Sequence, residues 1–129
     1  MPDPFHVQRM YQVSQRATDL DRAIAFYQDV LGLTFIAQFD PPGLAFFDLG
    51  NTRLLLEAPA PSSVLYLAVD DIDVAYDTLR ARGVEFLGAP HLIHRDDSGQ
   101  FGPAGEEEWM AFFNDPDGNT LALVERRSA

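Results

Sequence analysis

The pattern of apolar and polar positions along the chain predicts the same succession of elements twice. In each half a strand, at 10–17 and 64–69, is followed by a polar step and then by apolar residues at spacings of three and four, which are typical of one helix face. The stripe of the first half is Leu20, Ile24, Tyr27 and Leu31, and that of the second half is Ile72, Tyr76 and Leu79. Gly32 and Gly83 are expected to end the helices, because glycine tolerates a left-handed conformation.

Three further strands are expected to complete each half, at 33–39, 44–49 and 52–57, then at 84–93, 108–114 and 120–125. The pattern therefore predicts an α+β protein of two tandem βαβββ modules, the first at about 8–58 and the second at about 64–126. Residues 59–63 are interpreted as a short joint within a single domain that spans 1–129, because each module has only one helix with which to cover its sheet.

Three pairs of segments repeat in the same order, which supports a duplication. They are 18–21 with 70–73, 44–47 with 110–113, and 50–52 with 118–120. The second half is longer because residues 90–109 replace a short turn at 40–43.

Composition and charge exclude several classes of function. A net charge of −11 argues against nucleic acid, whose phosphates are bound by clustered Lys and Arg. The absence of cysteine excludes disulfides, thiolate nucleophiles and cysteine-based metal sites. The sequence has no basic stretch followed by an apolar run at its start, and no apolar run of roughly eighteen residues, so we expect a cytoplasmic protein without a membrane partner.

Two segments resemble the vicinal-oxygen-chelate superfamily, which includes glyoxalase I and bleomycin-resistance proteins. Residues 19–33, DLDRAIAFYQDVLGL, resemble its first-helix signature, and residues 114–119, NDPDGN, resemble the turn before its last strand. With the second helix, the resemblance spans about residues 10–125. It implies the glyoxalase/bleomycin-resistance fold, in which the modules form a cup-shaped sheet, a small molecule binds in the cup and the chain forms a homodimer.

The resemblance also assigns the superfamily's metal ligands to four positions, which are Gln12, Leu54, Val64 and Ala122. Only Gln12 carries a donor atom, and a divalent ion needs several N, O or S donors. We therefore expect no metal and no other cofactor, with a divalent metal as the alternative. A register shift of one or three residues would turn Glu57 or Glu125 inward; otherwise both are expected at strand ends as solvated or dimer-contact carboxylates.

The alternation of side chains along a strand extends the predicted cup. The positions that share the facing of Gln12 and Val64 are Ser14, Arg16, Leu56, Tyr66, Ala68 and Val124. We expect Gln12 and Ser14 to orient a carbonyl or hydroxyl group of the ligand. Arg16 would hold a carboxylate or phosphate, and Tyr66 would stack on a flat ligand. The alternative for Arg16 is a surface ion pair. For Tyr66 and the two AFF runs, core packing is the favoured interpretation.

The insertion at 90–109 is expected to be a lid or a binding loop. It holds the remaining candidates, which are His91, His94, Arg95, Glu107 and Trp109. His94 is the candidate general base near Glu107 or Glu108, of which Glu107 is the assigned partner, and Arg95 would hold a substrate anion. On a regular strand His91 and His94 face opposite sides, so a shared metal ion would require a bend. A solvated acidic loop with incidental histidines is the favoured interpretation over this catalytic role.

Three functions are consistent with the sequence. The favoured one is a metal-independent module that binds a small organic molecule in the cup and resembles bleomycin-resistance proteins. The second is a metal-dependent lyase or isomerase of glyoxalase or epimerase type. The third is a metal-free lyase or isomerase that uses His94 and loop glutamates for proton transfer.

Overall fold

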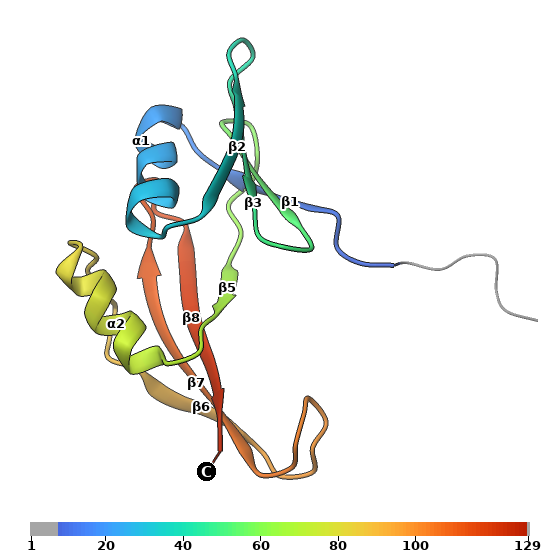
Figure 1. Cartoon of the computed structure of the whole chain (residues 1–129). Helices are drawn as coiled ribbons and strands as arrows, with labels where there is room; N and C mark the ends of the chain where they lie inside the picture. The colour runs from blue at the N-terminus through green and yellow to red at the C-terminus, as the bar shows by residue number, and fades with distance from the viewer. Residues whose placement is uncertain (1–7, 129) are drawn as a thin grey trace, which may run out of the picture. The chain divides into compact units, whose positions relative to one another are not determined.

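The computed structural model describes residues 8–128, which form two compact units divided between Ser62 and Ser63 (Figure 1). The division falls within the joint expected at 59–63. Each unit has one four-stranded sheet with helical structure against one of its faces. The α+β class and the two modules are therefore confirmed, while a single domain that includes both units stays a prediction.

Unit 1 contains four strands and two helical segments. In chain order they are β1 (Gln12–Arg16), α1 (Leu20–Ala25), η1 (Phe26–Val30), β2 (Thr34–Phe39), β3 (Leu44–Asp48) and β4 (Arg53–Glu57). Its strands lie in the order β1-β4-β3-β2. β1 is parallel to β4, and the β2–β3 and β3–β4 pairs are antiparallel. The first and last strands of the unit are therefore neighbours.

The helical segment of unit 1 begins at a capping carboxylate and ends in a π-helical turn. The side chain of Asp19 accepts a hydrogen bond from the backbone N–H of Arg22 at 3.2 Å, as a helix N-cap does. In η1 the backbone N–H of Leu31 donates to the carbonyl of Phe26, five residues back, at 3.0 Å. Tyr27 in this turn is fully buried, so the predicted apolar stripe does face the sheet.

Unit 2 repeats this arrangement with β5 (Leu65–Ala68), α2 (Ile72–Ala81), β6 (His91–Asp96), β7 (Glu106–Asn114) and β8 (Thr120–Arg127). The strand order is β5-β8-β7-β6, again with the first strand parallel to the last. Asp71 is the N-cap of α2, and its carboxylate accepts the backbone N–H groups of Asp73 and Val74 at 3.1 Å. Neither α-helix within residues 8–128 has the length and apolar character that a bilayer span requires.

The strand expected at 84–93 lies instead at His91–Asp96, as β6. Between α2 and β6 only Phe86 pairs with the sheet, through an isolated bridge to Phe113. Pro90 has no N–H to donate to a strand ladder, and regular pairing begins immediately after it. Half of the insertion therefore belongs to β6 and to an earlier start of β7, and the loop itself is reduced to 97–105.

Each sheet has one face against its helical segment and a second face, here called the helix-free face, without one. The residues on the helix side are at most 3% exposed, and they are Ala45, Phe47, Leu54 and Leu56 in unit 1 and Ala111, Phe113, Leu121 and Leu123 in unit 2. In the AFF runs, alternation therefore sends the middle phenylalanines, Phe46 and Phe112, to the helix-free faces. The expectation of core packing holds for only one phenylalanine of each run.

Glu125 closes the amino-terminal end of α2, which corrects its expected place as a solvated or dimer-contact carboxylate. Its Oε1 accepts hydrogen bonds from the backbone N–H of Ile72 at 2.8 Å and from Nη2 of Arg127 at 3.3 Å.

Glu125→Ala is expected to lower the free energy of unfolding by about 1 kcal/mol, the usual loss for a removed capping oxygen. Urea unfolding measures this. Glu125→Gln retains an oxygen and is the control; an equal loss in both variants would contradict the capping role.

Candidate functional site

A β-bulge in β6 decides which way the two histidines face. The pairing of β6 with β7 shifts between Leu92 and His94, so that His91 pairs with Met110 and His94 pairs with Glu108. Paired residues share a face of the sheet, and Met110 and Glu108 are two residues apart on β7. Both histidines therefore lie on the helix-free face, in contrast to the opposite facing expected for a regular strand.

The helix-free face of unit 2 changes from apolar to polar across two rows of paired residues. The first row is Tyr66, Ala122 and Phe112, and the second is Ala68, Val124, Met110 and His91. Tyr66 is 59% exposed, whereas the small side chain of Ala122 beside it is fully buried. The ring of His91 lies 6.3 Å from that of Phe112, between ring centroids. This face thus offers aromatic and thioether surface next to an imidazole.

The structure places His94 next to Glu108 and not next to Glu107. Glu108 is the register partner of His94, and Glu107 faces the opposite side of the sheet. There, Glu107 accepts a hydrogen bond from the indole N–H of Trp109 at 3.0 Å. The expected pair of His94 and Glu107 is therefore not assembled within this unit. The His94 ring instead meets Phe101 edge-on, at 6.1 Å between centroids.

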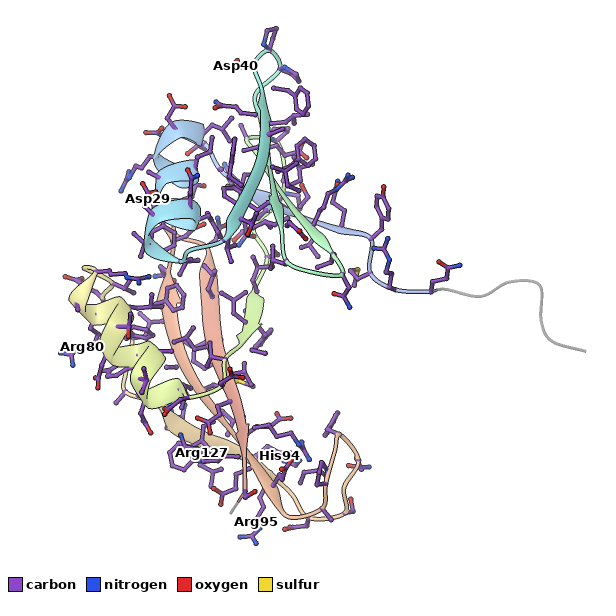
Figure 2. The ribbon with its side chains drawn as sticks, in the orientation of Figure 1. Asp29, Asp40, Arg80, His94, Arg95 and Arg127 are labelled. Atoms are coloured by element: carbon purple, nitrogen blue, oxygen red, sulfur yellow. The ribbon has the colours of Figure 1, made fainter. Side chains whose placement is uncertain are left out.

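Two other candidates, Arg95 and Trp109, lie on the helix side of the sheet. Arg95 forms an exposed ion pair with Asp97 at 3.2 Å, and it projects away from His94 (Figure 2). The guanidinium of Arg127 stacks over the Trp109 ring at 4.5 Å. These residues are not brought together with Tyr66 and the histidines.

The 97–105 loop is fastened by a buried carboxylate. Asp96 is 1% exposed, and its oxygens accept the backbone N–H groups of Gln100 at 2.8 Å and Phe101 at 2.9 Å. Nη2 of Arg126 donates to Asp96 at 2.6 Å, and Nε of Arg126 donates to Glu106 at 2.6 Å. The loop is therefore tied to β8 on both sides of its base.

The same contacts fix the charge state of Asp96. The hydrogen bond from the Phe101 N–H and then that from Arg126 hold the pKa of the Asp96 carboxyl well below its usual range, although burial acts in the opposite direction. The hydrogen bond to Asp96 raises the pKa of Arg126 in turn. A Cβ atom at Gly102 would lie 2.7 Å from Nε of Arg126, so the loop also packs against this guanidinium.

The helix-free face of unit 1 carries two polar pairs over an apolar row. Nε and Nη2 of Arg53 donate to Oε1 of Gln12 at 3.1 and 2.7 Å, and the Ser14 hydroxyl donates to Glu57 at 3.0 Å. The row between Arg53 and Glu57 begins at Ser14 and continues across the sheet with the apolar residues Leu55, Phe46 and Ala37. Arg16 lies level with Glu57 on this face and is exposed.

The register corrects the facing expected for Leu54, Leu56 and Glu57 on β4. Leu54 and Leu56 pair with Val13 and Gln15, so both lie on the helix side, and Leu55 and Glu57 take the helix-free positions. The cause is the turn before the strand: four residues separate the paired Asp48 and Arg53, whereas five separate the paired Asn114 and Thr120. The Gly-Asn-Thr repeat aligns the two turns but misplaces β4 by one residue. Glu57 thus faces the helix-free side, and its counterpart is Val124 rather than Glu125.

The model of the Glyoxalase/Bleomycin resistance protein/Dioxygenase superfamily matches residues 9–123. The chain belongs to this superfamily. It is 29% identical to the lactoylglutathione lyase of Haemophilus influenzae in an alignment of 131 positions that covers 88% of this chain and 89% of that protein. A superfamily member from Sphaerobacter thermophilus is 28% identical, with a TM-score of 0.71 over 92% of this chain and 98% of that one. An antibiotic-binding protein from Streptomyces shares the fold at 24% identity, with a TM-score of 0.70 over 95% and 98% of the two chains.

The positions that this superfamily uses for metal do not fit a metal ion here. With the register corrected, they are Gln12, Leu55, Val64 and Ala122, of which three carry hydrocarbon side chains. Oε1 of Gln12 accepts both hydrogen bonds of the Arg53 guanidinium, so a cation already occupies the one donor atom. No three His, Asp or Glu side chains within residues 8–128 are grouped closely enough to hold an ion.

Several residues of the helix-free faces were not among the predicted site residues. Phe112 and Met110 alternate with the core residues of the second AFF run, a signal that the sequence contains. Glu108 follows the same alternation on β7. That His94 shares its face depends on the bulge in β6, and the facing of Arg53 depends on the turn before β4, so neither follows from alternation.

Proposed function

We propose that this superfamily member binds a small, partly aromatic or carboxylated molecule on the helix-free faces of its sheets, without a metal ion. The face of unit 2 carries the proposal, because Tyr66, Met110 and Phe112 form a broad apolar surface next to His91 and His94. Small-molecule sites combine such apolar surface with a few polar groups. A homodimer and a cytoplasmic location stay predictions from the sequence.

Stacking on Tyr66 gives the first test. A panel of aromatic carboxylic acids and aromatic antibiotics is screened by thermal shift, and the compound with the largest shift is titrated by calorimetry. Tyr66→Ala is expected to weaken its binding about tenfold, because a stacked aromatic pair is lost together with its buried area.

Val74→Ala is the matched control, since Val74 on α2 is 60% exposed, as Tyr66 is at 59%. Equal weakening in both variants, or the absence of any stabilising compound, would contradict the proposal. So would a stoichiometric divalent ion in protein purified without chelators that is lost in Gln12→Ala.

A metal-free lyase or isomerase is the second candidate, and the pairing of His94 with Glu108 on one face favours it. The imidazole of His94 would take a proton from a substrate carbon next to a carbonyl group and return it to the neighbouring atom. Glu108 replaces Glu107 as the carboxylate beside it. In a turnover assay of the bound compound, a loss of kcat in His94→Ala with unchanged affinity would favour this enzyme over a binding module.

A further inference from the structure

The turn between β3 and β4 lines a pocket at the end of the sheet of unit 1. Its volume is about 330 Å³, at the lower end of the range for small-molecule sites. The segment before β1 and the residues in and beside this turn form it, and those that matter here are Arg9, Tyr11, Asp48, Asn51, Thr52 and Arg53. All of them belong to unit 1.

Two arginines of an acidic protein line this pocket, and both are held by uncharged groups. Arg53 stacks over the Tyr11 ring at 4.9 Å, and its hydrogen bonds go to the amide oxygen of Gln12. Arg9 stacks over the same ring at 5.2 Å and donates Nη1 to the carbonyl oxygen of Asn51 at 2.8 Å. Among residues 8–128, neither guanidinium forms an ion pair with a carboxylate. Their positive charge is therefore positioned but not neutralised.

Each guanidinium retains donors for a ligand. Arginine has five N–H groups, of which Arg53 uses two for Gln12 and Arg9 uses one for Asn51. The Thr52 hydroxyl in the lining is buried and has no hydrogen-bond partner in the described part of the chain. Planar guanidinium groups that are already oriented bind carboxylate and phosphate oxygens strongly and with defined geometry.

Asp48 is the carboxylate in the lining, and it limits the charge that the pocket accepts. Its Oδ1 accepts the backbone N–H of Gly50 at 2.9 Å, and it is paired across the strands with Arg53 without an ion pair between them. A doubly charged phosphate would be repelled by this carboxylate more strongly than a singly charged group.

We propose that this pocket binds the carboxylate or phosphate group of a small molecule between the guanidinium groups of Arg9 and Arg53. Asp48 favours the carboxylate. Arg53 belongs to the helix-free face of unit 1 through its pair with Gln12. This anion site nevertheless goes beyond the proposed function, because it requires none of the residues on the helix-free face of unit 2 that carry that proposal.

Titration of the full chain with benzoate, inorganic phosphate and neutral benzamide tests the site, with the arginine Nε–H signals followed by NMR. Benzoate and phosphate are expected to shift the signals of Arg9 and Arg53, benzoate at lower concentration, while benzamide leaves them unchanged. Arg9→Gln and Arg53→Gln are each expected to weaken benzoate binding about tenfold, the usual loss of a charge-assisted hydrogen bond. Asp48→Asn, which retains an acceptor for Gly50, is expected to strengthen phosphate binding more than benzoate binding.

Arg80→Gln is the matched control. Arg80 stacks over Tyr76 at 5.2 Å on α2 (Figure 2), and its replacement changes the net charge by the same amount. Equal weakening in this variant, or equal binding of benzamide and benzoate, would overturn the proposal. Arg9 is exposed and lies before β1, so Arg9→Gln remains informative if Arg53→Gln does not fold. Tyr66→Ala should leave phosphate binding unchanged, which separates a failure of this site from a failure of the proposed function.

Discussion

Arg126→Gln is expected to lower the thermal midpoint of unit 2 by on the order of 10 °C. The guanidinium of Arg126 lies 2.6 Å from oxygens of Asp96 and Glu106 and 3.6 Å from Glu108. Without it, three carboxylates remain close together, and that of Asp96 is buried without a cation. Removing one partner of a buried ion pair is strongly destabilising, because the other charge stays out of water. Thermal unfolding followed by circular dichroism measures the change.

Arg95→Gln is the control for this prediction. It removes an ion pair from the same hairpin, but the side chains of Arg95 and Asp97 are 54% and 83% exposed. Exposed pairs contribute less than about 1 kcal/mol, so the midpoint should hardly move. Equal shifts in the two variants would show that the buried contacts of Arg126 do not fasten the hairpin.

The acid dependence of stability follows from the lowered pKa of Asp96. The folded-state pKa of this carboxyl lies below its unfolded value of about 3.9, so its contribution to stability is fully present above that pH and is lost as the pH falls further. The stability difference between the natural protein and Asp96→Asn should accordingly be constant near neutral pH and become smaller below about pH 4. Measuring urea unfolding of both proteins across this range gives the difference directly.

Local patterns were enough to predict the architecture. The apolar stripes that include Tyr27 and Leu79 fixed both helices, and the caps at Asp19 and Asp71 follow from the polar steps before them. These signals depend on residues within a few positions of one another. Alternation along β1 likewise placed Gln12 and Ser14 on one face correctly.

The candidate site was only partly predictable. The face on which its side chains lie depends on irregularities in the strands and turns, and these cannot be predicted from simple alternation. The bulge after Leu92 returns His94 to the face of His91, so a three-residue spacing no longer means opposite sides. One additional residue in the turn before β8 shifts the equivalence of the two last strands, which moved Leu54 out of the site and Leu55 into it. Such shifts depend on the length and geometry of the turns, which the alternation of apolar residues does not reveal.

The AFF run of β7 allows this facing to be tested with two neighbouring phenylalanines. Phe113 is fully buried on the helix side and its ring packs against Phe86 at 5.2 Å, between centroids. Phe113→Ala is expected to lower the free energy of unfolding by about 3–5 kcal/mol, because it leaves a cavity in the core. Phe112 is half-buried on the helix-free face, and Phe112→Ala should cost less than half as much. Urea unfolding of both variants measures these losses.

Ligand binding should show the opposite order. Phe112→Ala removes a ring beside Tyr66 and Ala122 and is expected to weaken the compound found by thermal shift about tenfold. Phe113→Ala, studied at a temperature where it remains folded, should bind that compound with unchanged affinity. Equal losses of stability in the two variants would contradict the register of β7. A normal affinity in Phe112→Ala would move the binding surface away from this face, because the removed ring lies at its centre.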